Sequence, residues 1–180
     1  AAIIKMFLRL YKVNRVLFLV DRLELETQAE KEINDFLKND FETAIWKENK
    51  DDWRRANIVV STVQSFTRNN KHKRIFKPNS FDLVISDEAH RSQVNLDQKI
   101  KVTDTGVTKS FGFAKYLHDS LPNATYVGFT GTPIDATLDV FGKVVDAYTM
   151  TESVKDEITV RIVYEGRAAK IALNNSELDN

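Results

Sequence analysis

Two adjacent carboxylates and a histidine follow a short apolar run in the segment SFDLVISDEAHRSQ, residues 80–93. The run, residues 83–85, is typical of a buried strand, and it leads almost directly into Asp87 and Glu88. A carboxylate at the end of a strand can hold a hydrated Mg²⁺ ion, which prefers oxygen ligands and keeps several of its waters. A neighbouring carboxylate can orient the water that attacks a nucleotide γ-phosphate. His90 follows two residues later and could contact that phosphate or the end of the next strand.

Two other interpretations of this acidic segment stay open. In one, Asp87 and Glu88 lie in a solvated turn and favour the start of the following helix. In the other, they join His90 as direct ligands in a metal hydrolase. That site would lack a companion ligand pair at a usual metal-site spacing, because the remaining histidines are His72 and His118. His118 falls in a helical pattern and is expected at the surface.

The rest of the chain alternates short apolar runs with helical patterns. Strands are expected at 15–20, 57–62, 81–86 and 124–130, and helices at 2–12, 23–37 and 110–119. The stretch between the last helix and the third strand, residues 91–107, is polar and suggests no element. Parallel strands that are buried on both faces have such continuous apolar runs. The pattern therefore predicts an α/β fold with a mostly parallel sheet and helices on both faces.

The pattern changes after Pro133. Residues 143–150 and 157–166 are expected to form strands, and the last eleven residues are mostly polar and expected to fray. We therefore predict a main domain at 1–150 and a trailing segment at 151–180.

Polar residues follow each of the four predicted strands. They are Asp21-Arg22, Ser61-Thr62, Asp87-Glu88 and Thr130-Gly131-Thr132. Because the carboxyl ends of parallel strands meet at one edge of the sheet, where ligands bind in such folds, these residues predict one site or one groove.

Each of these strand ends also has a structural interpretation. Asp21 and Arg22 could serve as charges at the start of a helix, and Thr62 could cap the helix that follows it. Gly131 and the proline after Thr132 favour a tight turn. We expect that turn to hold Thr130 and Thr132 near His90.

Composition restricts the classes of function. The chain has 180 residues, no cysteine, and 26 basic against 26 acidic residues, so a DNA-binding surface would have to be a local patch. The basic segment TRNNKHKRIFK, residues 67–77, is either such a phosphate-contacting patch or a solvated loop. No apolar run approaches the roughly 18 residues that span a bilayer. We expect a cytoplasmic protein that does not enter a membrane.

Four motifs, in order and with suitable spacing, resemble those of superfamily 2 helicases and translocases. VISDEAHRSQ resembles the Walker B segment (motif II), and VGFTGTPI, residues 127–134, resembles motif III. VLFLVDRLELETQ, residues 16–28, resembles motif Ia, and NIVVSTVQSF, residues 57–66, resembles the DNA-contacting segment after it. The sequences FLVDR, DEAHRSQ and GFTGTPI together resemble those of the motor subunit of type I restriction enzymes. Residues 1–150 carry this resemblance well, and the following passage carries it less specifically.

The resemblance implies the first RecA-like domain, a three-layer fold, of an ATP-driven translocase on double-stranded DNA. The cofactors would be ATP and Mg²⁺, and the partners would be the specificity and methyltransferase subunits of a restriction complex, with DNA cleavage by a nuclease domain elsewhere. The resemblance assigns catalysis to Asp87 (which would also bind the metal), Glu88 and His90, coupling to Thr130, Gly131 and Thr132, and nucleic-acid binding to Asp21, Arg22, Thr62, Gln64, Arg68, Lys71, Lys73 and Arg74.

One motif of that family is missing from the sequence. No G-x-x-x-x-G-K-[ST] phosphate loop is present, and the chain starts at Ala1 within an apolar helical pattern. We therefore expect a fragment of a longer parent protein, cut just after the loop and without ATPase activity of its own. The alternatives are a DNA helicase or type III restriction motor of the same superfamily, or, for the fragment alone, an inactive DNA-binding module.

Overall fold

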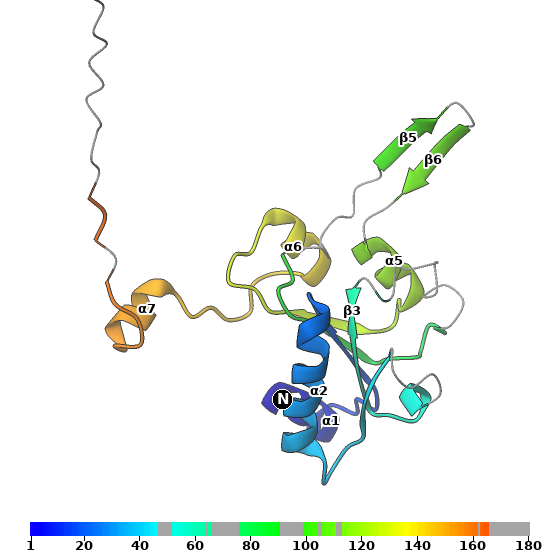
Figure 1. Ribbon diagram of the computed structural model, residues 1–180, viewed down its shortest axis with the longest axis horizontal. Helices are drawn as coiled ribbons and strands as arrows, with labels where there is room; N and C mark the ends of the chain where they lie inside the picture. The colour runs from blue at the N-terminus through cyan, green and yellow to red at the C-terminus, as the bar shows by residue number, and fades with distance from the viewer. Residues whose placement is uncertain are drawn as a thin grey trace, which may run out of the picture. The chain divides into compact units, whose positions relative to one another are not determined.

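A five-stranded sheet lies at the centre of residues 1–143, the first of two compact units in the chain (Figure 1). The computed structural model describes residues 1–46, 52–63, 65, 76–90, 99–103, 106–110, 113–161 and 163–165. The sheet strands are β1 (Val16–Val20), β2 (Thr43–Ile45), β3 (Ile58–Thr62), β4 (Leu83–Ser86) and β7 (Thr125–Gly128). The other elements of this unit are α1 (Ala2–Leu10), α2 (Leu23–Leu37), η1 (Asp52–Arg54), α5 (Phe113–Ser120), α6 (Asp135–Phe141) and the strands β5 (Lys99–Thr103) and β6 (Gly106–Ser110).

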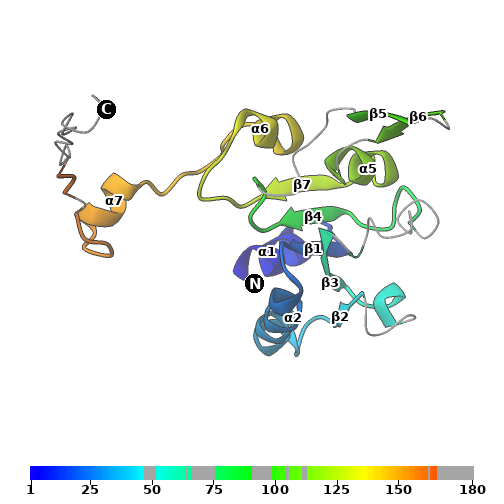
Figure 2. The ribbon, with the colours of Figure 1, turned by 45° about the horizontal axis from the view of Figure 1, so that its top comes forward.

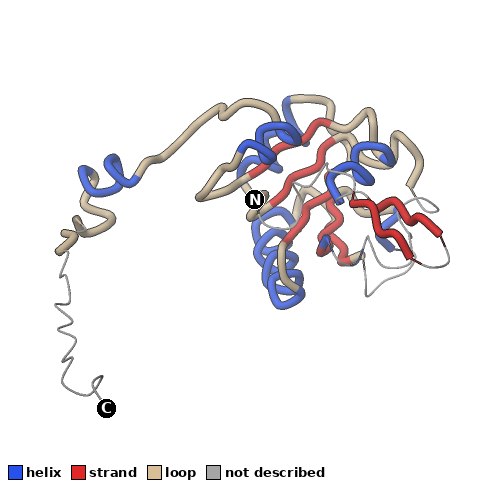
Figure 3. Tube along the Cα trace, turned by 90° about the horizontal axis from the view of Figure 1, so that it is seen from above, coloured by secondary structure: helices blue, strands red, loops and turns tan. Residues whose placement is uncertain are grey.

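Every neighbouring pair of strands in this sheet is parallel, and the strand order is β2-β3-β1-β4-β7. Figure 3 shows the strands, in red, with helices near them. Parallel strands cannot be joined by a tight hairpin, so the connections between these strands cross over a face of the sheet. Such crossovers carry helices and cover both faces. The predicted α/β class with a mostly parallel sheet is confirmed.

Side chains that alternate along the strands build a separate core on each face. From β1, Leu17 and Leu19 contribute to one cluster, which contains Leu117 of α5 and Trp53 of η1. Val16 contributes to the other, which contains residues from α1 and α2. Figure 2 shows the sheet between these helices. The central strands β1, β3 and β4 are almost completely buried, as their continuous apolar runs predict.

The amino edge of the sheet is closed by one arginine and one aspartate. Asp82 Oδ2 accepts hydrogen bonds from the backbone N–H groups of Asn14 and Arg15, at 2.8 and 3.0 Å. The Arg15 guanidinium donates to the Trp53 carbonyl at 2.6 Å and lies 4.8 Å from the centre of the Phe81 ring. Burial lowers the pKa of Arg15, and the Asp82 charge partly offsets this. These contacts join the starts of β1 and β4 to the segment before β3.

The first unit contains elements that the sequence did not predict. β5 and β6 form an antiparallel hairpin within and just after the stretch 91–107, where no element was expected. The alternation of β-branched and polar residues in KIKVT is a strand signal that the overall polarity of the stretch obscured. β2 and α6 were also missed, since three residues and seven residues are too short to give a clear periodic pattern.

The second unit, residues 144–180, contains the helix α7 (Met150–Lys155). The strands predicted at 143–150 and 157–166 are wrong within the described residues, which have no strand there. The hydroxyl of Thr149 accepts from the Glu152 N–H, and the Glu152 carboxylate accepts from the Thr149 N–H at 2.6 Å. This capping box starts a helix where the apolar residues alone suggested a strand. The last eleven residues lie outside the described ranges.

The predicted boundary at residue 150 stays a prediction.

No helix in the described part of the chain is long and apolar enough to cross a membrane.

Candidate functional site at the carboxyl edge of the sheet

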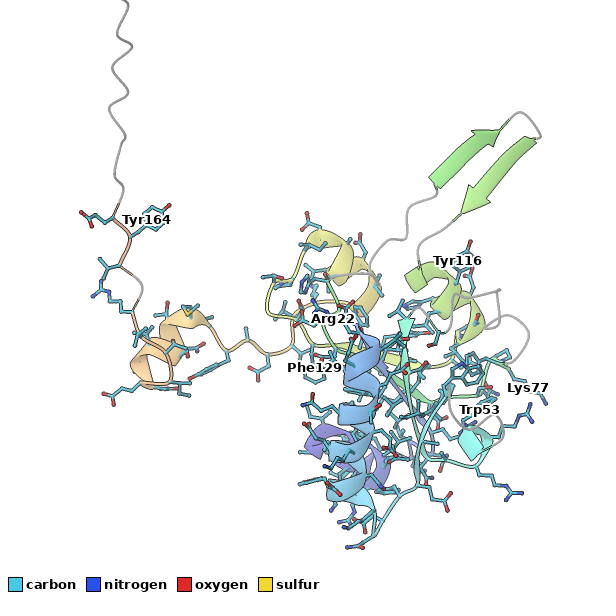
Figure 4. All side chains as sticks on the ribbon, in the orientation of Figure 1. Arg22, Trp53, Lys77, Tyr116, Phe129 and Tyr164 are labelled. Carbon is cyan, nitrogen blue, oxygen red and sulfur yellow. The ribbon has the colours of Figure 1, made fainter. Side chains whose placement is uncertain are left out.

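The carboxyl ends of four strands bring the predicted site residues to one edge of the sheet. Val20 is in register with Thr62, and Ser86 is in register with Leu19 on one side and Gly128 on the other. The segments that follow β1, β3, β4 and β7 therefore leave the sheet at the same edge. In Figure 4, Arg22 and Phe129 lie toward this edge, whereas Trp53 and Lys77 lie toward the opposite one.

Backbone hydrogen bonds fix the acidic turn between β1 and β7. The N–H of Asp87 donates to the Leu19 carbonyl at 2.9 Å, and the N–H of Ala89 donates to the Phe129 carbonyl at 2.9 Å. The Phe129 N–H in turn donates to the Ser86 carbonyl at 2.8 Å. The chain from residue 87 to 90 is therefore held against both neighbouring strand ends as it leaves the sheet.

Glu88 adopts a backbone conformation that is unusual for a residue with a side chain. Its φ angle is +48°, in the left-handed region, where such a residue costs of the order of 1–3 kcal/mol. Its N–H donates to Asp87 Oδ1 at 3.0 Å, which offsets part of this cost. The left-handed residue reverses the chain within one turn, so that both carboxylates and His90 lie at the end of β4.

His90 connects the acidic turn to the threonine turn after β7. Its Nδ1 and the Thr130 hydroxyl share a hydrogen bond of 2.6 Å, in which the tautomer of the imidazole decides the donor. The same Nδ1 lies 3.5 Å from Glu88 Oε2. The Thr130 hydroxyl also accepts a hydrogen bond from the Thr132 N–H at 3.1 Å. The predicted closeness of Thr130 to His90 is thus confirmed. Thr132 joins this network through its backbone N–H, which donates to Thr130.

The ends of β1 and β3 carry the other predicted residues. Asp21 and Arg22 form an ion pair of 3.8 Å at the start of α2, as their structural interpretation predicted. The Thr62 hydroxyl lies 2.8 Å from the Ser65 hydroxyl and accepts from the Ser65 N–H at 3.3 Å, so the predicted capping contact is present. Capping and ligand contact are not exclusive.

Five predicted nucleic-acid-binding residues lie outside the described ranges: Gln64, Arg68, Lys71, Lys73 and Arg74. Gly131 is exposed, and a Cβ atom added there would meet nothing within 4 Å. His118, expected at the surface, is half-buried and stacks on the Tyr126 ring with 3.8 Å between centroids.

Sequence reasoning missed two residues of this edge. Glu26 of α2 is buried, and its carboxylate accepts a hydrogen bond from the Thr62 N–H at 2.6 Å. Its spacing of seven residues from Ile33, on the apolar face of α2, was a usable signal. At Gly128, a Cβ atom would lie 2.9 Å from the Phe141 ring and 3.0 Å from Ala89 Cβ. Nothing in the local sequence indicates that close approach.

The donor set of this edge suits a hard cation better than a soft one. The described residues include no group of three or more histidine, aspartate, glutamate or cysteine side chains able to hold a metal ion by themselves. Two carboxylates at a strand end match Mg²⁺, which takes one or two protein oxygens and completes its shell with water and phosphate. Zinc, which takes three or four side-chain ligands, has no such set among the described residues.

Comparisons with known proteins agree with this architecture. The chain is 41% identical over 128 residues to the type I restriction enzyme HindI endonuclease subunit of Haemophilus influenzae, which covers 68% of this chain and 12% of that protein. It is 28% identical over 172 residues to the putative type I restriction enzyme MjaIXP endonuclease subunit of Methanocaldococcus jannaschii, covering 91% of this chain and 15% of that one. The chain thus spans about an eighth to a seventh of the length of these relatives.

Solved structures share the fold. The SWI2/SNF2 ATPase core of Sulfolobus solfataricus in complex with double-stranded DNA superposes with a TM-score of 0.51 at 16% identity, covering 77% of this chain and 26% of that one. The Hef helicase domain of Pyrococcus furiosus gives a TM-score of 0.53 at 19% identity, covering 78% and 30%. The RecA-like fold is therefore confirmed, as is the resemblance to the motor subunits of type I restriction enzymes. The model of the SWI2/SNF2 ATPase family matches residues 1–180, and the chain belongs to that family.

Proposed function

We propose that these 180 residues are part of the first motor domain of a type I restriction enzyme's endonuclease subunit. In this proposal, the parent protein, meaning the longer chain that contains them, hydrolyses ATP to translocate along double-stranded DNA in the cytoplasm. The observation that carries the proposal is the hydrogen bond between His90 and Thr130, which joins the acidic turn to the next strand end. The similarity to restriction endonuclease subunits supports it independently.

Asp87 and Glu88 would have different tasks in this site. The Asp87 carboxylate would hold Mg²⁺ together with water and the nucleotide's phosphates, and the ion would neutralise charge on the phosphates when bound. The Glu88 carboxylate would accept a hydrogen bond, and then the proton, from the water that attacks the γ-phosphate. The rigid backbone of the acidic turn would keep both carboxylates at the end of β4 without reorganisation.

His90 and Thr130 would couple hydrolysis to the grip on DNA. Because His90 Nδ1 lies near both the Thr130 hydroxyl and the Glu88 carboxylate, a shift of the threonine turn changes the surroundings of the proton-accepting group. Gly131 and Thr132 would set the path of that turn. Asp21, Arg22 and Thr62 at the neighbouring strand ends, with Gln64, would line the DNA track, and the basic residues of 67–77 would contact DNA phosphates.

The proposal requires groups that this sequence does not contain. A phosphate loop and an arginine finger would have to come from other parts of the parent protein, and an arginine finger alone contributes about 10³–10⁵ in rate. The 180 residues by themselves should therefore release no phosphate from ATP, even with DNA present. The specificity and methyltransferase subunits would be the partners that direct the parent protein to its DNA site.

A displacement assay on the purified parent complex tests this proposal against its alternatives. Translocation on duplex DNA should displace a bound third strand in an ATP-dependent manner while the two strands of the duplex stay paired. Separation of the two strands of a forked duplex would indicate a helicase instead. Binding of DNA with neither activity, and without ATP hydrolysis, would contradict a motor function altogether.

A further inference from the structure

A buried carboxylate outside the acidic turn connects two of the segments that leave the carboxyl edge. Glu26 lies in the first turn of α2, the helix that begins directly after Asp21 and Arg22. Its side chain is 4% exposed, and Oε1 accepts the Thr62 N–H at 2.6 Å, across 36 residues of sequence. The bond therefore joins the helix after β1 to the last residue of β3.

The position of the Thr62 N–H explains why a side chain is needed there. The N–H groups of alternate strand residues point to the same side, and the Ile58 N–H points toward β2, where it donates to the Glu42 carbonyl at 3.0 Å. The Thr62 N–H, four residues later, points to that side as well. β2 ends at Ile45, and Trp46 makes the last described backbone bond to β3, from its N–H to the Val60 carbonyl at 3.0 Å. Glu26 takes the place of the strand carbonyl that β2 does not supply.

Stability alone gives a weak reason for a glutamate at this position. Burying a carboxylate carries a desolvation cost, and the short bond to a backbone N–H recovers only part of it. What the carboxylate adds is a directional hydrogen bond that holds the Thr62 backbone at a fixed position. It fixes Thr62, whose hydroxyl in turn caps the turn at Ser65.

We propose that Glu26 is a positioning residue of the DNA track, which holds the end of β3 at a fixed place relative to the start of α2. This inference rests on the proposed function, since it gives Thr62 and Arg22 the task of contacting DNA. Because Glu26 is itself buried, it would act through Thr62 and would not touch DNA. Losing it should loosen the end of β3, and therefore weaken the grip on DNA before it affects the chemistry of ATP.

The test compares Glu26→Ala, Glu26→Gln and the matched control Glu24→Gln in the parent complex. Glu24 is exposed on the first turn of the same helix. The readouts are the DNA concentration that half-saturates ATP hydrolysis, the KM for ATP, and hydrogen exchange of the peptide that contains Thr62. Glu26→Ala should raise the half-saturating DNA concentration about tenfold and accelerate exchange at Thr62, with the KM for ATP unchanged. Glu26→Gln keeps a neutral acceptor and should raise it about threefold.

Each outcome decides the matter. An unchanged half-saturating DNA concentration in Glu26→Ala overturns the inference, as does an equal loss in the control. If Glu26→Ala does not fold, the half-saturating DNA concentration of Glu26→Gln is compared with that of Glu24→Gln, and equal values overturn the inference. Arg22→Ala and Thr62→Ala separate this inference from the proposed function. If they weaken DNA binding while the Glu26 variants do not, only the inference about Glu26 fails. If none of the four does, the DNA track is wrong as well.

Discussion

At the amino edge of the central sheet, Asp82 accepts two backbone N–H groups, and Arg15 donates to backbone carbonyls between two aromatic rings. At the carboxyl edge, by contrast, His90 contacts a hydroxyl and a carboxylate at the same nitrogen, and Glu88 has a left-handed backbone. Polar side chains at the first edge hold backbone in place. Glu26 and Asp87 at the second edge also accept backbone N–H groups, but there His90 contacts the Thr130 and Glu88 side chains as well. The left-handed Glu88 adds strain to this turn, and such strain collects at functional sites.

A matched pair of substitutions tests this contrast with the largest expected effect. Asp87→Asn and Asp82→Asn make the same chemical change at opposite edges. Asp87→Asn removes the charge that would hold Mg²⁺, so ATP hydrolysis by the parent complex should fall about 10²-fold or more, with the free energy of unfolding changed by less than about 0.5 kcal/mol. Asp82→Asn should lower the free energy of unfolding by about 1–2 kcal/mol and keep hydrolysis per folded molecule.

Denaturant unfolding and a phosphate-release assay on the same samples check both halves of that prediction. If Asp82→Asn abolished hydrolysis without loss of stability, or Asp87→Asn only destabilised the fold, the assignment of the two edges would be reversed.

Gly128 tests whether packing also limits the carboxyl edge. The Cβ of Gly128→Ala would press on the Phe141 ring and on Ala89, so the free energy of unfolding should fall by about 1–3 kcal/mol. Gly131→Ala is the matched control, because a Cβ there meets no atom within 4 Å. Thermal unfolding of both variants is the measurement. Equal melting temperatures would show that Phe141 moves aside at little cost.

His90→Ala should affect coupling more than chemistry. Loss of the hydrogen bond to Thr130 should reduce the stimulation of ATP hydrolysis by DNA about tenfold, while hydrolysis without DNA stays within about twofold. Thr130→Val removes the same bond from the other side, together with the acceptor of the Thr132 N–H, and should have an effect at least as large. A strong effect of one substitution without the other would argue against the bond as the shared cause.

The surface ion pairs between α1 and Asp40, which follows α2, should have the smallest effect. A hydrogen bond from Lys5, together with the Arg9 guanidinium, holds the pKa of the Asp40 carboxyl below its usual range. Since the folded-state pKa is depressed, the stabilisation is present above the ordinary value of about 3.9 and is lost as the pH falls through the lower folded-state value.

Asp40→Asn should therefore lower the melting temperature at neutral pH by only about 1 °C, because exposed ion pairs contribute little. The difference in melting temperature from the wild type should vanish at pH values below the folded-state pKa of Asp40. Asp35→Asn, an exposed change on α2, is the control. A difference that persists below the folded-state pKa would point to a cause other than charge.

Much of the fold could be predicted because each buried strand is marked in the sequence by a continuous apolar run. The runs at 15–20, 57–62 and 81–86 contain β1, β3 and β4, which lie in the middle of the sheet and are apolar on both faces. Their polar ends then placed the candidate site at one edge. The family resemblance added roles that spacing alone left open.

The remainder depends on contacts between residues that are distant in sequence. Thr62 and Glu26 are 36 residues apart, and Gly128 approaches Ala89 and the Phe141 ring. No local sequence pattern predicts these contacts. In the second unit, the residues from 157 onward have an apolar alternation without a neighbouring strand in the described ranges, and the Thr149–Glu152 capping box decides the local structure instead. Figure 4 shows Tyr164 on this segment, where it is 93% exposed.

The central claim is that the carboxyl edge carries the chemistry of ATP hydrolysis, with Glu88 as the proton acceptor. The most direct test is single-turnover phosphate release by Glu88→Gln in the parent complex with saturating DNA, alongside binding of a fluorescent ATP analogue. Binding should stay within about twofold of the wild type while the rate of release falls about 10²-fold or more. Release at the wild-type rate from a variant that binds the nucleotide normally would contradict the claim.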